Sequence, residues 1–411
     1  MSRTSETLLV LDLGTTRVRA LIGRALSDER VQVLSVAEEL LPSNAMHAPP
    51  SQAEVVAAIQ RATSQAMSHA EEHLQDVWVA LPSTWGTLEE GVGEVFVDRG
   101  EIRGEHVASA VENACLPFVG PTRKAVHQWV LAATIDGRPI TAPFPGEKGK
   151  HLRLTTQMVI CSMRDLSQLL ETVKLAGFRP KGVLLETVAA GTGILESQEM
   201  NDGVVLVDLG ARKTSLGVWK NGVLADLASI DTGGLSFTEE LAMSLRIPMD
   251  AAARLQETSS CACLSTLASM QPRDIVLEGG EIRRVTPLAV AQILEPRVLE
   301  LFAEISSTLR ARGHQSDVRR VVLTGGGAWM QGLSQLAEEH FVQHGMELRL
   351  GLPTGLSAGR ELVSQTRYAT VVGLLREAAR GHRDRTFFRP QDEGVRRQLR
   401  KVFARFFDTF F

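Results

Sequence analysis

Two aspartates, Asp12 and Asp208, occupy the same position in a phrase that occurs twice in the chain. Each one closes an apolar run and is followed by Leu-Gly, a few polar residues and a second apolar run, which indicates a hairpin. An aspartate at the end of a buried strand can hold Mg²⁺ through water, and the glycine lets successive backbone N–H groups point at an anion. One copy alone is typical of an ordinary turn. The pair favours two phosphate-binding loops in a duplicated, two-lobed α/β fold.

A third glycine-rich element lies near the end of the chain. An apolar run from Val321 to Thr324 leads into Gly325, Gly326 and Gly327, and a helical pattern begins at Leu333. Three glycines permit the flat face of a ligand, or a phosphate, to approach the backbone closely. Alone, this segment would predict only a tight strand-to-helix connection.

Composition limits the class of protein. A chain of 411 residues exceeds one typical core, and its 44% hydrophobic share is that of a globular protein. No apolar run reaches the roughly 18 residues of a membrane helix, and the start, MSRTSET, lacks a signal-peptide pattern, so we expect a cytoplasmic protein. The four cysteines include no C-x-x-C pair, which predicts reduced, structural thiols without a metal.

Positive charge is concentrated at the C-terminus. The whole chain has a formal net charge of −4, but residues 380–411 carry nine Lys/Arg against four Asp/Glu, so this segment needs an acidic partner. From residue 394 onward, apolar and basic side chains follow helical spacing and form an aromatic face and a cationic face. The first contains Val395, Leu399, Val402, Phe403, Phe406, Phe407, Phe410 and Phe411, and the second Arg396, Arg397, Arg400, Lys401 and Arg405. This profile favours a helix in a membrane interface over one docked on the core or in a partner's groove.

In this order, the two loops and the glycine-rich turn resemble the actin and sugar-kinase ATPase superfamily, in which ATP is clamped between two lobes. With the tail, the resemblance narrows to the FtsA family, actin-like proteins that tie the tubulin-like division polymer FtsZ to the bacterial membrane. It rests on the DLGTTRV loop, the run Met158 to Cys161 with the helix after it, Ile230 to Gly234, Gln292 to Arg297, the TGGGA loop and the tail.

The resemblance implies an actin-like ATPase fold with an inserted small α/β (SHS2-like) subdomain and a C-terminal amphipathic helix. The expected division is 1–82 plus 163–198 for the first lobe, 83–162 for the insert, 199–237 plus 318–379 for the second lobe, 238–317 for a helical subdomain, 380–393 for a linker and 394–411 for the membrane helix. Within the insert we expect strands over 92–97, 126–134 and 152–160 and a helix over 104–115.

It also implies ATP or ADP with Mg²⁺ in the cleft, held by Asp12, Gly14, Thr15, Thr16, Arg17, Asp208, Gly210, Gly233, Gly234, Gly325, Gly326, Gly327 and Ala328, with Asp12 and Asp208 on the metal through water. The implied function is a peripheral protein of the cytoplasmic membrane at the septum that polymerises head to tail and binds FtsZ, other divisome proteins and anionic lipids, but no nucleic acid. We expect weak ATPase activity at most and assign no catalytic residue. The alternatives are a PilM-like scaffold of pilus or secretion machinery and, more remotely, a small-molecule kinase.

The chain departs from the family pattern at two places. The second loop continues as Ala211 to Ser215 where the family has further glycines, and Arg212 or Lys213 either binds phosphate instead or is solvated. The helix that usually supplies Glu and Lys to the nucleoside reads Ala251 to Gln256, without those charges. We therefore expect reduced nucleotide affinity and slow or absent hydrolysis. The scattered His47, His106, His127 and His151, the Trp78, Trp85 and Trp129 rings and Tyr368 fit packing roles better than sites.

Overall fold

The computed structural model describes residues 6–26, 30–42, 50–98, 100–140, 146–259, 261–265, 272–276 and 282–381. The expected membrane helix over 394–411, most of the linker before it and His47 lie outside the described residues, so the tail remains a prediction from sequence.

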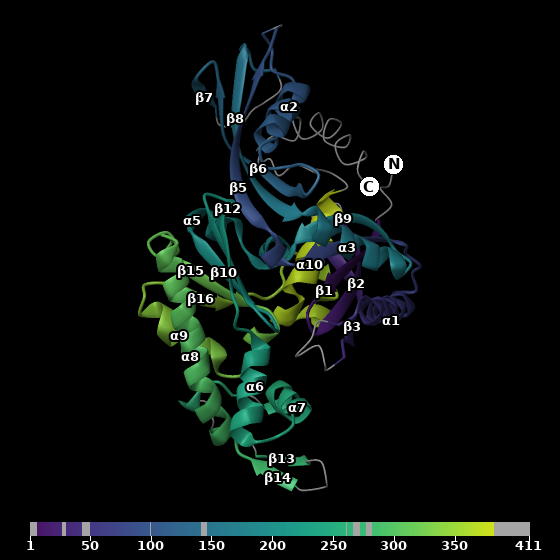
Figure 1. The fold of residues 1–411 in the computed structure, drawn as a ribbon, viewed down its shortest axis with the longest axis vertical. Helices are drawn as coiled ribbons and strands as arrows, with labels where there is room; N and C mark the ends of the chain where they lie inside the picture. Colours follow the sequence, from purple (N-terminus) through teal and green to yellow (C-terminus); the bar gives the residue numbers. More distant parts are fainter. Residues whose placement is uncertain are drawn as a thin grey trace.

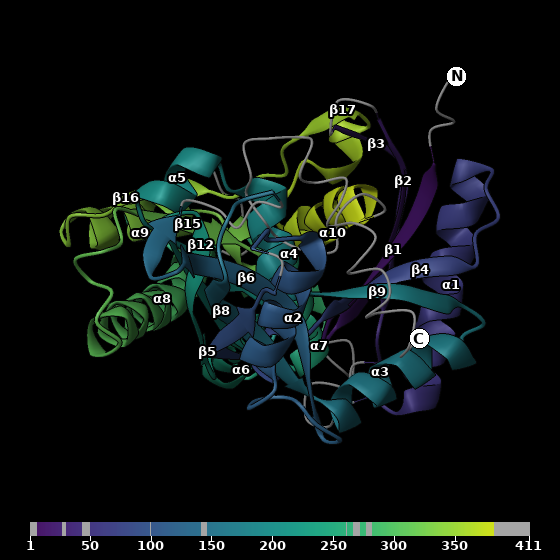
Figure 2. The same ribbon diagram turned by 90° about the horizontal axis from the view of Figure 1, so that it is seen from above.

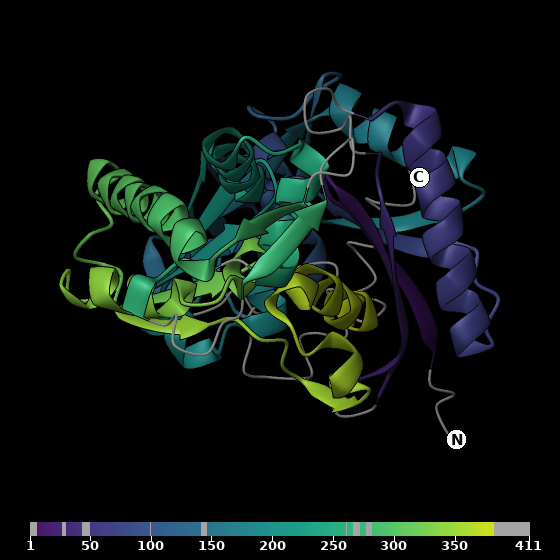
Figure 3. The ribbon, with the colours of Figure 1, turned by 90° about the horizontal axis from the view of Figure 1, so that it is seen from below.

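The first lobe is a six-stranded sheet built around the first aspartate loop (Figure 1). Its strands, in spatial order, are β17 (Leu356–Ala358), β3 (Val31–Leu40), β2 (Arg17–Ala25), β1 (Thr7–Leu13), β4 (Asp76–Leu81) and β9 (Arg179–Leu185). The predicted hairpin is confirmed, because β1 and β2 pair antiparallel out to Leu13 and Val18. Helices α1 (Gln52–Ala70) and α3 (Met163–Leu175) lie on one side of this sheet, and α10 (Ala369–Gly381) lies on the other (Figure 3).

The second lobe repeats the same arrangement. Its sheet order is β12 (Val223–Ile230), β11 (Thr214–Lys220), β10 (Val204–Leu209), β15 (Arg320–Thr324) and β16 (Glu347–Leu350). Strand β10 pairs antiparallel with β11 and parallel with β15, just as β1 pairs with β2 and β4. Buried aliphatic runs such as Val204 to Val207 suit central strands that are covered on both faces. The duplicated, two-lobed fold is therefore confirmed.

The insert forms a third layer above the junction of the lobes (Figures 1 and 2). Its sheet order is β5 (Thr87–Phe96), β8 (His151–Ser162), β6 (Arg123–Ile135) and β7 (Arg138–Ile140), and α2 (Gly104–Cys115) packs on it. Gly91 and Gly93 let α2 approach β5, since a Cβ on Gly93 would overlap the carbonyl oxygen of Ala110. The expected helix over 104–115 is confirmed, whereas the short strand β7 is a further element of the sheet.

The helical subdomain lies at the other end of the second lobe (Figure 1). It contains the helices α6 (Gly234–Leu245), α7 (Met249–Ser259) and α8 (Pro287–Ala311), and a hairpin of β13 (Arg273–Val276) and β14 (Ile282–Val285). Helix α9 (Leu333–Val342) belongs to the second lobe and packs beside α8. Thr286 begins α8 by accepting a hydrogen bond from the backbone N–H of Ala289 at 3.2 Å, and Pro287 occupies the first helical position.

One expected boundary is wrong. Residues 318–379 do not all complete the second lobe, because β17 pairs with β3 and α10 packs against β1, β2 and β4 of the first sheet. The chain thus returns to the first lobe after β16. The apolar pattern of α10 predicts a helix with a buried face, but it does not contain the information about which of two sheets that face covers.

Two helices join the lobes at a point where their backbones touch. Helix α4 (Glu186–Ile194) crosses α10, and a Cβ on Gly373 would overlap the carbonyl oxygen of Ala189, while one on Gly193 would overlap that of Ala369. Only glycine permits this approach at either position. The crossing holds α4, which also contacts β10 and β11 of the second lobe, against the first sheet.

No helix in the described part of the chain is both long and apolar enough to cross a bilayer. The four cysteines, Cys115, Cys161, Cys261 and Cys263, are buried free thiols.

The helix crossing is testable by one methyl group. In Gly373→Ala, the new Cβ would overlap the carbonyl oxygen of Ala189, and the overlap can be relieved only if α4 and α10 move apart. We therefore expect the free energy of unfolding to fall by about 2–4 kcal/mol. Gly120→Ala is the matched control, because no heavy atom lies within 4 Å of the added carbon. Urea unfolding measures both. Equal stability of the two variants would contradict a close crossing.

Candidate functional site

The candidate site lies where the ends of two parallel strand sets meet. Strands β1, β4 and β9 run parallel, as do β10, β15 and β16, so the loops after each set gather at one edge of each sheet. Such carboxyl edges are where open α/β sheets bind ligands. Asp12 and Asp208 stand at these edges. Asp12 is the second-last paired residue of β1 against β2, and Asp208 is the second-last paired residue of β10 against β11.

The first loop has the form of an anion cradle. Gly14, Thr15 and Thr16 connect Leu13 to Arg17 and are partly exposed. A Cβ on Gly14 would lie 3.1 Å from the carbonyl oxygen of Arg17, so the turn is tight at this residue. The carbonyl of Thr16 accepts the N–H of Leu41 at 2.9 Å, which fixes the loop to the end of β3.

The second loop is closed by its own backbone. The N–H of Gly210 donates to the carbonyl oxygens of Lys213 and Asp208, each at 3.1 Å. At the start of α6, the N–H of Gly234 donates to Gly210 at 2.9 Å and that of Leu235 to Ala211 at 2.7 Å. The amides that would bind an anion at a helix N-terminus are therefore already bonded to loop carbonyls.

The cationic side chains of this loop do not simply replace the lost glycines. Lys213 forms an ion pair with Asp231 at 2.8 Å, on the outer side of the loop. Gly233 packs directly on the loop, because a Cβ there would lie 2.6 Å from the carbonyl oxygen of Ala211. This ion pair is exposed to solvent, and phosphate binding by Lys213 or Arg212 stays a prediction.

The glycine-rich turn after β15 supports the second aspartate. Gly325 has φ +89°, and a Cβ there would overlap Oδ1 of Asp208, so no other residue fits. Thr366 donates its hydroxyl to the carbonyl of Gly325 at 2.8 Å. Gly327 packs on Leu209, whereas Gly326 has no heavy atom within 4 Å of an added Cβ. Gly326 is therefore the position in this turn that a ligand can approach, while Ala328 is buried.

Three carboxyl groups influence one another across the cleft. Burial, followed by the charge of Asp12, raises the pKa of Asp208 to about 6, although Arg19 opposes both. Burial, followed by the charges of Asp12 and Asp208, also raises the pKa of Glu186, the first residue of α4, well above its usual range. The N–H of Ser83 donates to Glu186 at 3.1 Å.

Arg19 is the resident cation of this acidic centre. Its guanidinium donates to Asp12 at 3.1 Å and to Glu38 at 3.3 Å. Burial raises the pKa of Asp12, but the charge of Arg19 and its hydrogen bond oppose that shift. The same ion pairs raise the pKa of Arg19, although burial opposes them.

The residues present fit a phosphate better than a directly bound metal. Within the described ranges, no group of three His, Cys, Asp or Glu side chains is arranged to hold a metal ion. Arg19 donates to Oδ2 of Asp12, which leaves one fewer carboxylate oxygen for a metal. Contact of Asp12 and Asp208 with Mg²⁺ through water, and of Arg17 with phosphate, stay predictions from the sequence.

Several of these groups were missed by sequence reasoning. Arg19 alternates with Arg17 on β2, so the period of a strand places both on one face. Glu186 directly follows the parallel strand β9, which is a position where functional side chains gather. Glu257, which binds Arg17, has no local signal because the contact joins residues 240 positions apart.

The remaining candidates have packing roles. Burial lowers the pKa of His127 to about 3, and its neutral Nε2 accepts the N–H of Leu185 at 2.9 Å. His151 stacks on Phe96, and Nδ1 of His106 accepts the N–H of Arg103 at 3.0 Å. The Trp129 ring is buried, those of Trp78 and Trp85 are partly buried, and Tyr368 bonds Glu38.

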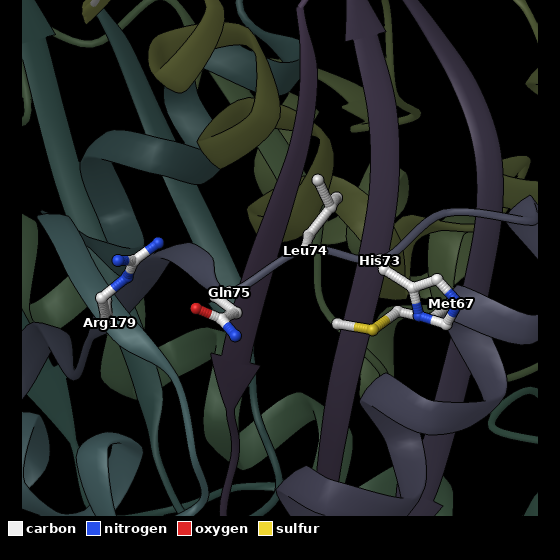
Figure 4. Close-up of a pocket in the computed structure, with 5 residues that line it drawn as sticks. All are labelled: Met67, His73, Leu74, Gln75 and Arg179. Atoms are coloured by element: carbon white, nitrogen blue, oxygen red, sulfur yellow. The ribbon is translucent and has the colours of Figure 1, made fainter.

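A pocket of about 420 Å³ lies away from these loops (Figure 4). It is lined by Met67, His73, Leu74, Gln75 and Arg179. Met67 is in the last turn of α1 and the other four stand where β4 and β9 begin, whereas the aspartate loops follow the strand ends. The pocket is therefore separate from the candidate site.

Comparison with known proteins identifies similar sequences over almost the whole chain. The family model "Cell division protein FtsA" matches residues 205–373. The FtsA of Pseudomonas aeruginosa is 27% identical over 378 residues, covering 91% of this chain and 89% of that protein. The FtsA of Bacillus subtilis is 26% identical over 384 residues, covering 92% and 85%.

Solved structures share the fold at low sequence identity. The PilM–PilN type IV pilus biogenesis complex matches with a TM-score of 0.62 and 16% identity, covering 90% of this chain and 98% of that one. MreB5 of Spiroplasma citri bound to ADP matches with a TM-score of 0.53 and 10% identity, covering 92% and 98%. A MamK double helical filament matches with a TM-score of 0.51 and 12% identity, covering 90% and 98%. These likenesses establish the actin-like fold.

The raised pKa of Asp208 predicts a pH-dependent stability. The native protein keeps a proton on Asp208 that the unfolded chain releases above pH 4, so the contribution of Asp208 to stability falls as the pH rises through about 6. In EDTA at pH 7.5, we expect Asp208→Asn to unfold with a free energy up to about 3 kcal/mol larger than the parent chain, and this gain to shrink by about 2 kcal/mol at pH 4.5.

Asp231→Asn is the control for this measurement, because Asp231 is an exposed acid on the same loop system. Urea unfolding at several pH values gives the comparison. A gain for Asp208→Asn that does not change with pH would contradict the raised pKa.

Proposed function

We propose that this chain, a divergent member of the FtsA family and thus an actin-like cell-division protein, binds ATP or ADP between its lobes and tethers FtsZ to the membrane. Nucleotide binding is the part of this proposal that the geometry supports best. The carrying observation is that Asp12 and Asp208 stand at matching strand ends of the two lobes, near enough for the charge of Asp12 to raise the pKa of Asp208, while Gly325 packs on Asp208. A ligand that contacts both lobes would bias their closure, which is how a nucleotide can control assembly.

Nucleotide serves here as a conformational ligand with little turnover. Burial, followed by the charges of Asp12 and Asp208, raises the pKa of Glu186 well above its usual range, which disfavours the ionised form that acts as a general base. The N–H groups of Gly210, Gly234 and Leu235 are bonded to loop carbonyls, so they are not available as donors for developing negative charge. We expect no burst of phosphate release and no fast steady turnover.

Assembly and partner binding follow from the family. The proposed partners are a second copy in a head-to-tail polymer, FtsZ and other divisome proteins, and the MamK filament supports the polymer as a mode that this fold permits. The proposed membrane contact is the amphipathic segment 394–411, through anionic lipids at the septum. Because each basic residue near an anionic surface contributes only about 1 kcal/mol, one copy binds weakly and a polymer binds firmly.

A role as a pilus scaffold has less support than the role in cell division. The likeness to PilM is one of fold at 16% identity, whereas sequence similarity over nine-tenths of the chain is to division proteins.

Nucleotide binding at the first loop is testable by calorimetry with Mg²⁺-ATP and with ADP. Arg17→Gln removes a charge-assisted contact to phosphate, so we expect affinity to fall about tenfold. The control is Arg24→Gln on the same strand, since Arg24 pairs with Glu72 at the opposite end of β2. An equal loss in both variants would place the nucleotide elsewhere, and absence of heat at millimolar nucleotide would refute binding.

The membrane contact is testable by sedimentation with anionic vesicles. We expect the full chain to sediment and a chain ending at Gly381 to remain in the supernatant. A full-length variant with Phe403, Phe406 and Phe407 changed to Ser keeps the length and charge of the tail, and should also fail to sediment. Sedimentation of all three proteins to the same extent would refute a membrane role for this segment.

A further inference from the structure

The cation of the first loop is already bound by an acid from the other side of the cleft. The guanidinium of Arg17 contacts Glu38 through Nη1 at 3.5 Å and Glu257 through Nη2. Glu38 belongs to β3 of the first lobe, but Glu257 belongs to α7 of the helical subdomain. One side chain therefore connects the first loop, in one half of the molecule, to a helix of the other half.

Helix α7 is held in the position that makes this contact possible. Gln256, which precedes Glu257, donates to the carbonyl of Gly234 at 3.0 Å and accepts the hydroxyl of Thr238. Gln256 thus fastens α7 to the first turn of α6, next to the second loop. Glu257 extends from this fixed point toward the first lobe, with 61% of its side chain exposed.

The two acids that bind Arg17 differ in how permanently they are placed. Glu38 has only 15% of its side chain exposed and also interacts with Arg19, Arg367 and Tyr368. Burial acts against its charge, but these neighbours lower the pKa of Glu38 overall, so it stays ionised. Glu257 faces solvent and can leave at little cost, because exposed ion pairs are weak. Glu257 is therefore the exchangeable partner of Arg17.

We infer that Glu257 acts as an internal substitute for a nucleotide phosphate. It occupies Arg17 and links the lobes when no nucleotide is bound, and a phosphate must displace it to reach the same guanidinium. This inference rests on the proposed nucleotide binding and adds its regulation: Glu257 and a nucleotide phosphate compete for the same guanidinium. The same carboxylate lowers affinity, because it repels the incoming anion.

The test is a charge-removing variant with a control on the same helix. Glu257→Gln keeps the size of the side chain but no longer competes for Arg17, so we expect ATP affinity, measured by calorimetry, to rise roughly three- to tenfold. Asp250→Asn makes the same change in net charge on α7, where Asp250 pairs with Arg254 at 2.7 Å, and should leave affinity within about twofold.

A second measurement needs no nucleotide. Hydrogen exchange of the empty protein should become faster in the first loop, residues 14–17, on Glu257→Gln and stay unchanged on Asp250→Asn, because the bridge is lost only in the first variant. Unchanged exchange in both variants would overturn the inference.

The outcomes separate this inference from the proposed function. If the parent chain binds ATP and Glu257→Gln binds it equally or more weakly, Glu257 does not compete with phosphate and the inference is wrong. If neither protein binds ATP but loop exchange rises in Glu257→Gln alone, nucleotide binding is refuted and the bridge between the lobes stands. Binding by Glu257→Gln but not by the parent chain would be the strongest support for competition.

Discussion

The contact between the backbones of α4 and α10 is the constraint on which the rest of the architecture depends. Because Gly193 and Gly373 carry no Cβ, the backbones of the two helices approach each other directly. Helix α4 also contacts β10 and β11 of the second lobe, so the crossing links the two sheets that carry Asp12 and Asp208.

The charged side chains between the lobes are distributed unequally over the two halves of the duplicated fold. The first half has three arginines near its loop, Arg17, Arg19 and Arg367, and they share Glu38 and Asp12. In the second half, Asp208 lies against a glycine turn, and burial raises its pKa; the opposing charge comes from Arg19 of the first half. The first loop is thus suited to an anion, while the second is occupied by hydrogen bonds within the protein.

Sequence reasoning succeeded where the signal is local. The apolar runs before Asp12 and Asp208, the glycines after them and the helix at 104–115 each depend on neighbours within one element, and the structure has the expected hairpins and helix. The predicted boundary was wrong for β17 and α10, because the choice of sheet depends on residues that are distant in sequence. The hydroxyl of Ser357 in β17, for example, donates to the carbonyl of Val31, which is 326 positions away. The role of Glu186 was equally hidden, since a carboxyl group acquires a raised pKa only from the burial and charges that the assembled cleft provides.

The hydrogen bond between His127 and Leu185 gives the insert a mechanical connection to the cleft. His127 is on β6 of the insert, and Leu185 immediately precedes Glu186 at the start of α4. Because the imidazole is buried and neutral, stretching this bond would leave a buried N–H without an acceptor, which is costly. A displacement of β6 relative to the end of β9 therefore costs a buried hydrogen bond next to Glu186. The position of the insert and that of the first turn of α4 are coupled through this bond.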